Sequence, residues 1–134
     1  MKNTAESIKG IEQGRASFAY KKVIEAKQAL KEDEAKYKSY VKKIPMYIKT
    51  NGLGPAFAFV KSKNKEKAYE LIYKQTEEWL KESGCLSGQE ELIEQIIKKN
   101  STDYRYLTNE VLALFNWLRR FSEGLIKGEV DDEN

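Results

Sequence analysis

Apolar residues recur at intervals of three and four positions along almost the whole chain, which is the spacing that places them on one face of an α-helix. No stretch alternates apolar and polar residues over a length that would predict a β-strand. The clearest run lies near the C-terminus, at Tyr104, Leu107, Val111, Leu114, Leu118, Phe121 and Leu125. The pattern therefore predicts an all-α fold.

The periodic segments divide the chain into about six helices. We expect them near residues 4–31, 33–44, 56–61, 64–84, 87–100 and 101–125. The last helix is the longest, and its roughly 24 residues would extend about 36 Å at ~1.5 Å per residue. The chain is thus predicted to form a compact bundle with a long C-terminal core helix that packs against several shorter partners.

Proline and glycine indicate where the second helix ends and the third begins. Pro45 disfavours helical geometry in the residue before it, so we expect it to end or kink the second helix. Residues Asn51 to Pro55 form the clearest turn of the chain, because Asn and Gly tolerate positive φ. Pro55 suits the first position of the helix that follows.

Polar residues and glycine mark the ends of the later helices. Asn64 is placed to cap the fourth helix, and Gly84 is placed to end it. Residues Ser87 to Glu90 have the Ser-x-x-Glu form of a capping box ahead of the fifth helix. The sixth helix is expected to begin near Ser101.

Length and charge add an expectation about partners. The chain has 134 residues, a length typical of one compact domain. Its formal net charge is +3, but residues 129–134 hold four acidic residues and no basic one, so the rest carries +7. We predict one helical domain, residues 1–128, followed by a disordered acidic tail. A basic body attracts polyanions, although Lys-rich helices also serve solubility.

The residue inventory argues against catalysis. The chain has no histidine and one cysteine, Cys85, so it offers no catalytic triad, no internal disulfide and no usual zinc site. No carboxylates form a recognisable acid/base or metal-binding pattern. We expect no enzymatic activity, no cofactor, no metal and no small-molecule substrate. Without a signal-peptide core or an apolar run of about 20 residues, we also expect a cytoplasmic protein with no membrane contact.

Arg15 is the first candidate for a binding role. It lies on the apolar side of the first helix, so its guanidinium must reach solvent, a carboxylate or a phosphate. Glu12 lies three residues earlier, at a spacing where a local ion pair forms easily. The sequence leaves both interpretations open: a structural ion pair, or a contact to RNA or to a partner protein.

A second candidate region surrounds the central turn. Just before the turn, Tyr40 and Tyr47 are flanked by the basic residues Lys42, Lys43 and Lys49. Basic residues interleaved with aromatics suit a nucleic-acid backbone. We predict that the tyrosines are core residues. For the lysines, the sequence leaves two interpretations open: contact with phosphate, or a solvated helix surface. The turn residues Asn51, Gly52 and Gly54 could expose backbone N–H groups to phosphate, but a purely structural turn is favoured because the spacing matches no phosphate-binding loop.

Three arginines near the C-terminus complete the set. Arg105, Arg119 and Arg120 are three of only four arginines in a chain that otherwise uses lysine. Arginine suits bidentate contacts to phosphate or carboxylate, so a binding role is expected for them. The helix macrodipole alone also favours arginine near a helix C-terminus.

Taken together, three blocks resemble the small subunit of the type III-B CRISPR (Cmr) effector complex. The second block is the most specific. The blocks are Glu12, Gln13, Arg15, Ala16 and Ala19; Tyr40 to Gly54 continuing into Ala56 to Phe59; and Tyr104, Arg105, Thr108, Glu110, Ala113, Leu114 with Trp117 to Phe121. Pro55 departs from the family, which often has a small polar residue at that position.

The resemblance implies a non-catalytic subunit of antiviral defence. Copies of it would stack into a minor filament beside the backbone and large Cmr subunits, where target RNA pairs with the crRNA. Arg15, Lys43, Lys49, Arg105, Arg119 and Arg120 are then the expected RNA or subunit contacts, with Asn51, Gly52 and Gly54 shaping the surface. The alternative is a helical adaptor whose basic face binds acidic proteins and never contacts RNA.

Overall fold

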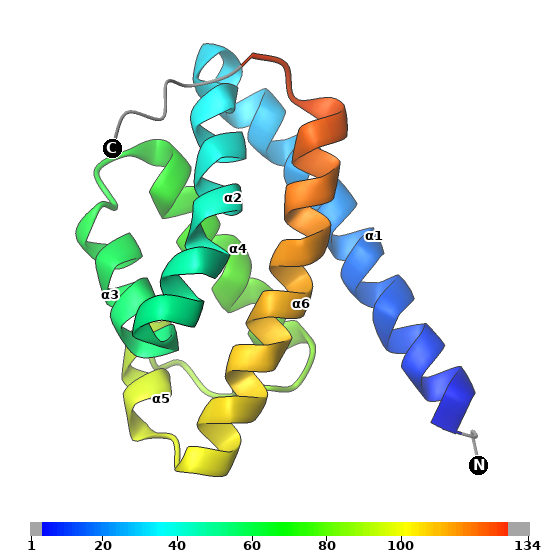
Figure 1. The fold of residues 1–134 in the computed structure, drawn as a ribbon, viewed down its shortest axis with the longest axis vertical. Helices are drawn as coiled ribbons and strands as arrows, with labels where there is room; N and C mark the ends of the chain where they lie inside the picture. The colour runs from blue at the N-terminus through cyan, green and yellow to red at the C-terminus, as the bar shows by residue number, and fades with distance from the viewer. Residues whose placement is uncertain (1–3, 129–134) are drawn as a thin grey trace.

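The structure is a computed structural model that describes residues 4–128, with side chains from residue 10 onward. It contains α1 (Thr4–Leu30), a 3-10 turn η1 (Lys31–Asp33), α2 (Glu34–Asn51), α3 (Leu53–Ser62), α4 (Lys67–Glu82), α5 (Leu92–Lys98) and α6 (Ser101–Leu125) (Figure 1). The predicted all-α class is confirmed, with five helices of ten or more residues and the seven-residue α5. The predicted acidic tail, 129–134, lies outside the described residues.

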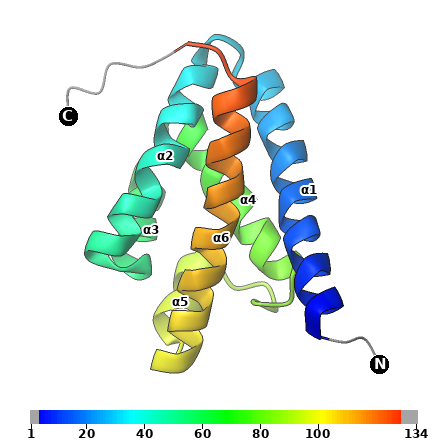
Figure 2. The ribbon, with the colours of Figure 1, turned by 45° about the vertical axis from the view of Figure 1, so that its right-hand side comes forward.

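The long C-terminal helix α6 organises the bundle. It packs along both α1 and α2, while α3 and α4 cover the other side of α2, and α5 sits against α3 (Figures 1 and 2). Both views also show the first turns of α1 extending past the rest of the molecule. Ile11, on that extension, is 50% exposed. The two helices nearest the chain ends, α1 and α6, are therefore neighbours in space.

The core forms where the apolar faces of these helices meet. The helix α6 buries Leu107, Val111, Leu114 and Leu118, as the periodicity predicted. Phe57 of α3 is fully buried and meets Phe115 of α6 edge-on, with ring centroids 6.2 Å apart. The predicted long core helix is thus confirmed, and α3 is joined to it through aromatic packing.

The predicted end of the second helix at Pro45 is wrong. The helix α2 runs through Pro45 to Asn51. Proline removes one backbone hydrogen bond and crowds the preceding turn, at a cost of about 3 kcal/mol. Ile44 and Ile48, on either side of it, are buried in the core, and this packing offsets the loss. Tertiary contacts therefore carry the helix past a residue that usually interrupts one.

Two predicted caps are also wrong. The helix α4 begins at Lys67 after a turn over residues 63–66, so Asn64 does not cap it. The helix α5 begins at Leu92, well after Ser87, and its first N–H groups donate to side chains of α4. Leu92 N–H donates to Glu77 Oε2 (2.8 Å), and Ile93 N–H to the Tyr73 hydroxyl (3.2 Å). Caps from a distant helix leave no local sequence pattern.

Other predicted helix ends are confirmed. Gly84 follows the last turn of α4 with φ of +83°, a conformation that glycine adopts at little cost. The helix α6 begins at Ser101, where the side chain of Asn100 accepts a hydrogen bond from Asp103 N–H (2.8 Å). Within residues 4–128, no helix combines the length and the apolar character that crossing a membrane requires.

Candidate functional site

A basic groove lies between α2 and α6. Its volume is about 310 Å³, and we call it the α2–α6 groove. It is lined by Lys42, Pro45, Met46 and Lys49 of α2 and by Leu112, Phe115, Asn116 and Arg119 of α6. The lining contains three cationic side chains and no carboxylate. Two residues singled out from the sequence, Lys49 and Arg119, are therefore brought together from positions 70 residues apart.

Helical spacing explains this arrangement. Lys42 and Lys49 are seven residues apart, or about two turns, so both side chains emerge on the same face of α2. Both are exposed, whereas Arg119 is half-buried. Lys43 and Arg120 lie on the same two helices but outside the groove lining; Lys43 is half-buried and Arg120 is exposed.

Arg105 lies at the opposite end of α6 from the other two arginines. It is exposed and lines a separate hollow of about 450 Å³ with Lys99, Ser101, Tyr104 and Thr108. Its Cα is 14 residues from that of Arg119 along α6, or about 21 Å at the helical rise. The fold thus does not gather the three C-terminal arginines in one site: Arg119 lines the groove, Arg105 lines this hollow, and Arg120 lines neither.

The turn at residues 51–54 is a tight corner closed by a tyrosine. Asn51 is the last residue of α2 and Leu53 the first of α3, so only Gly52 separates the two helices. Gly52 has φ of +94° and ψ of 161°, and its N–H donates to the Ile48 carbonyl at 2.8 Å. The Gly54 N–H donates to the Tyr104 hydroxyl at 2.8 Å. Both N–H groups already donate hydrogen bonds within the chain. This favours a structural turn over a phosphate-binding loop.

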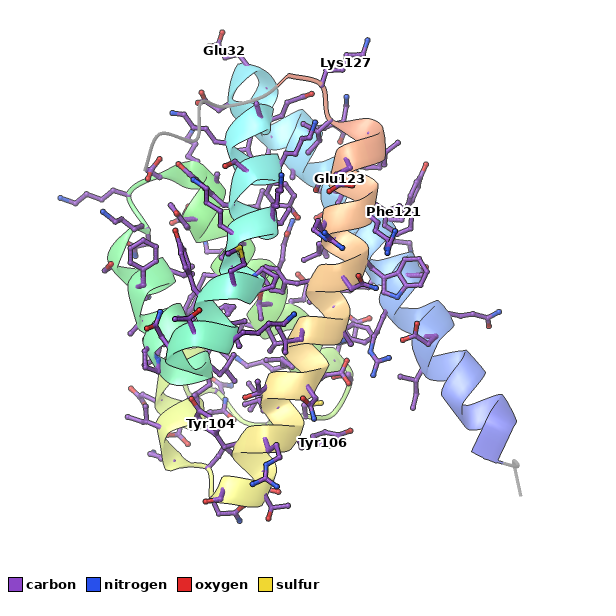
Figure 3. The ribbon with its side chains drawn as sticks, viewed as in Figure 1. Glu32, Tyr104, Tyr106, Phe121, Glu123 and Lys127 are labelled. Carbon is purple, nitrogen blue, oxygen red and sulfur yellow. The ribbon has the colours of Figure 1, made fainter. Side chains whose placement is uncertain are left out.

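Tyr104 approaches this corner from the first turn of α6. Figure 3 places it at the end of α6 that lies beside α5. A Cβ atom added at Gly52 would lie 3.2 Å from the Tyr104 hydroxyl oxygen, closer than an ordinary contact. Glycine is therefore required at residue 52 for two reasons, its backbone conformation and the room it leaves for Tyr104.

Gly52→Ala is consequently expected to lower the free energy of unfolding by about 2 kcal/mol, since this backbone region is essentially restricted to glycine. Urea unfolding followed by circular dichroism would measure the loss. Gly124→Ala is the matched control, because Gly124 lies in α6 with nothing within 4 Å of an added Cβ. That control should be neutral or slightly stabilising, and equal losses for the two variants would contradict the argument.

Arg15 is held inside the chain by a buried carboxylate. Its Nε donates to Glu110 Oε2 (2.7 Å) and one terminal nitrogen donates to Glu110 Oε1 (2.9 Å). The other terminal nitrogen contacts Glu12, the partner expected from the sequence. Trp79 Nε1 of α4 also donates to Glu110 Oε2 at 2.9 Å. The structure thus favours the ion-pair interpretation for Arg15.

The electrostatics of this cluster agree with its geometry. Hydrogen bonds from Arg15 hold the pKa of Glu110 below its usual value, with a further contribution from Trp79 and in spite of burial. The hydrogen bond to Glu110 in turn raises the pKa of Arg15. The Arg15 and Glu110 side chains are only 16% and 7% exposed. We call these three residues the Arg15–Glu110–Trp79 cluster; it joins α1, α6 and α4.

Sequence reasoning missed a second hollow, between α2 and α3. This α2–α3 hollow has a volume of about 430 Å³ and is lined by Tyr47, Asn51, Pro55, Ala56 and Phe59. The Tyr47 and Phe59 rings meet nearly edge-on, with centroids 5.4 Å apart and an angle of 77°. Tyr47 and Asn51 are four residues apart in the sequence, and so are Pro55 and Phe59. This helical spacing was the signal that could have indicated the hollow.

The tyrosines are less buried than expected. Tyr47 is half-buried at the hollow rather than in the core, and Tyr40 is half-buried with its ring stacked on Tyr69 at 3.9 Å. The Tyr40 hydroxyl donates to Glu66 (2.8 Å), and burial followed by that hydrogen bond raises the pKa of Tyr40. The expectation of core tyrosines therefore holds only in part, because both rings pack against the core but remain partly exposed.

Within the part of the chain that the structure describes, no group of three or more His, Cys, Asp or Glu side chains is arranged to hold a metal ion. Cys85 is half-buried, and its sulfur accepts a hydrogen bond from the Ser83 hydroxyl at 3.3 Å. Glu110 and Glu91 are engaged in ion pairs with Arg15 and Lys61. The linings of the α2–α6 groove and of the hollow beside Tyr47 and Phe59 instead offer cationic and aromatic side chains.

Comparisons with known proteins give matches in both sequence and fold. Residues 11–125 match the family model described as CRISPR-associated protein (Cas_Cmr5). A curated relative, the CRISPR system Cmr subunit Cmr5 of Thermus thermophilus, is 33% identical over 112 residues, which are 84% of this chain and 92% of the relative. A crystal structure of a CRISPR-associated Cmr5 family protein from the same organism superposes with a TM-score of 0.72 at 33% identity, covering 87% of this chain and 96% of that one. The likeness extends over most of both chains, in sequence and in fold.

Proposed function

Because the chain belongs to the CRISPR-associated Cas_Cmr5 family, we propose that it is the non-catalytic small subunit of a type III-B (Cmr) effector complex. Its partners are the backbone and large Cmr subunits, further copies of itself, and the paired crRNA and target RNA. In this role it forms the minor filament that helps to hold target RNA against the crRNA in antiviral defence.

The observation that carries the RNA-holding part of the proposal is the α2–α6 groove. Three cations, Lys42, Lys49 and Arg119, line it without a carboxylate among them. Several other lysines are paired with carboxylates within the chain; Lys22, for example, pairs with both Glu25 and Glu78. Cations that face a groove bind phosphates without reading sequence, which suits a complex that leaves specificity to base pairing.

The absence of a catalytic role is part of the same proposal. With no histidine in the sequence and no metal-binding group among residues 10–128, the chain offers neither a general base of the usual kind nor a ligand set. The buried ionisable cluster, Arg15 and Glu110, is occupied in joining helices. A supporting, RNA-holding subunit accounts for these features more simply than an enzyme does.

The test is reconstitution of the complex with wild-type chain, without it, and with Lys42→Glu/Lys49→Glu. For single-stranded nucleic acid, the logarithm of affinity falls with the logarithm of salt by about 0.7 for each phosphate neutralised. Loss of two such contacts is expected to weaken target-RNA binding about tenfold at 0.15 M salt and to lower the salt slope by about 1.4. Both lysines are exposed, so folding should be unaffected.

Lys21→Glu/Lys74→Glu provides the matched control, with the same change in net charge at two exposed lysines outside the groove. Equal weakening by both pairs would mean that net charge, not the groove, governs binding. If the chain fails to assemble with Cmr subunits, the subunit role is wrong. If the groove variant loses a partner protein while its RNA affinity is unchanged, the adaptor with a basic face becomes the better description.

A further inference from the structure

The α2–α3 hollow has a lining unlike that of the basic groove. The single-residue corner at Gly52 turns α3 back alongside α2 (Figures 1 and 2), which places Tyr47 and Asn51 opposite Pro55 and Phe59. The lining contains two aromatic rings, one proline ring and one side-chain amide, and no charged residue. Its volume of about 430 Å³ is in the range of small-molecule sites.

These groups match the chemistry of a nucleobase. Bases stack on aromatic side chains and form hydrogen bonds with amides, which both donate and accept. Phe59 is 37% exposed, so part of its ring remains open to a ligand. Asn51 is exposed at the end of α2, where its amide borders the hollow. The hollow thus combines a stacking surface with a hydrogen-bonding group.

Charge around the hollow favours a nucleic acid over an apolar protein segment. The Lys63 ammonium lies 5.7 Å from the centroid of the Phe59 ring. Across α2 lies the α2–α6 groove with its three cations. An aliphatic partner side chain would gain nothing from these charges, whereas a polyanion that also carries aromatic bases would use both surfaces.

We propose that the α2–α3 hollow binds an unpaired base of a single-stranded RNA whose phosphates lie in the α2–α6 groove. The inference rests on the proposed function, since it assumes that the groove holds RNA. A helix with its side chains is about 10–12 Å across, so a few nucleotides are enough to pass over α2 from the groove to the hollow. Met46, which lines the groove on α2 next to Tyr47 in the sequence, is 67% exposed.

The test compares two probes on the full chain: a single-stranded RNA of about twelve nucleotides, and an oligomer of the same length with an abasic backbone. Tyr47→Leu and Phe59→Leu keep apolar volume but remove the aromatic face. Each is expected to weaken binding of the RNA about tenfold, from the loss of one stacked base, with an unchanged salt slope and unchanged affinity for the abasic oligomer.

Two further variants separate this inference from the proposed function. Phe59→Trp keeps an aromatic face and should retain RNA affinity, while Lys42→Glu/Lys49→Glu should weaken binding of both probes.

If the leucine variants bind RNA as the wild type does, the base site is wrong and the groove stands. If the wild type binds neither probe, the RNA role itself fails. If the leucine variants lose a Cmr subunit but keep RNA affinity, the hollow docks protein and the inference is overturned. Thermal unfolding of each variant checks that the fold is retained.

Discussion

Glu110→Ala is expected to lower the free energy of unfolding by about 3 kcal/mol, the lower end of the range for removing one partner of a buried ion pair. The substitution leaves the Arg15 guanidinium without its bidentate acceptor and the Trp79 N–H without its partner. Both groups are largely shielded from water, so solvent replaces the lost hydrogen bonds poorly. Urea unfolding, with the m-value and the midpoint of the transition fitted globally, measures this loss of free energy.

The control for this substitution is Glu12→Ala. Glu12 also contacts Arg15, but its side chain is half exposed, so its removal should change stability by no more than about 0.5 kcal/mol. The comparison separates the buried contact from the local one on the same guanidinium. A loss of equal size in both variants would show that Glu110 has no special role.

The pH dependence provides an independent check on the same residue. The folded-state pKa of Glu110 is depressed by Arg15 and Trp79, so its contribution to stability is fully present above the pKa of an unfolded Glu, about 4.3. That contribution is lost as the pH falls through the lower folded-state pKa. The stability difference between wild type and Glu110→Ala should therefore be constant near neutral pH and shrink in acid. A difference that grows in acid would contradict the assignment.

Phe57→Ala is expected to lower the free energy of unfolding by about 4 kcal/mol, in the range for removing a fully buried aromatic ring. Phe57 is 0% exposed and its ring meets Phe115 of α6 and Tyr73 of α4. The cavity would therefore open where three helices meet, and none of the three could move into it without disturbing the other two. Because domains of this kind have only about 5–15 kcal/mol of stability, the urea midpoint should fall sharply.

Phe59→Ala serves as the comparison for this core substitution. Phe59 lies on the same helix, two residues further on, but it is 37% exposed. Water reaches part of its ring in the folded state, so less apolar area is lost and the cost should be about 1–2 kcal/mol. If both substitutions cost the same, the difference in burial between the two sides of α3 would not govern stability.

Most of the fold was predictable because local periodicity dominates it. The buried apolar face of α6 follows from the spacing of Leu107 to Leu118. The start of that helix at Ser101 follows from the cap at Asn100. The errors occurred where distant residues decide local structure. Buried Ile44 and Ile48 carry α2 past Pro45, and Glu77 and Tyr73 cap α5 from another helix. Neither effect is visible in a short window of sequence.

The candidate site was predictable in composition but not in arrangement. Lys49 and Arg119 were identified from residue type, and the fold places them in one groove together with Lys42, which was grouped with its neighbours but not singled out. Arg15 could not be assigned, because its main partner, Glu110, lies 95 residues away. The α2–α3 hollow depends on the tight corner at Gly52, and the sequence indicated a longer turn there.

The pairing of α1 with α6 has a consequence for synthesis of the chain. The Arg15–Glu110 contact closes a loop of 95 residues, so α1 must wait for α6, its main packing partner, to be synthesised. Until then only part of the apolar side of α1 is covered, as where Phe18 packs on Trp79 of α4, and the rest remains open to water and to other chains. Non-local contacts of this kind form late, after the entropy of loop closure has been overcome. Nascent chains that stall before α6 are therefore the form most exposed to aggregation and most in need of chaperones.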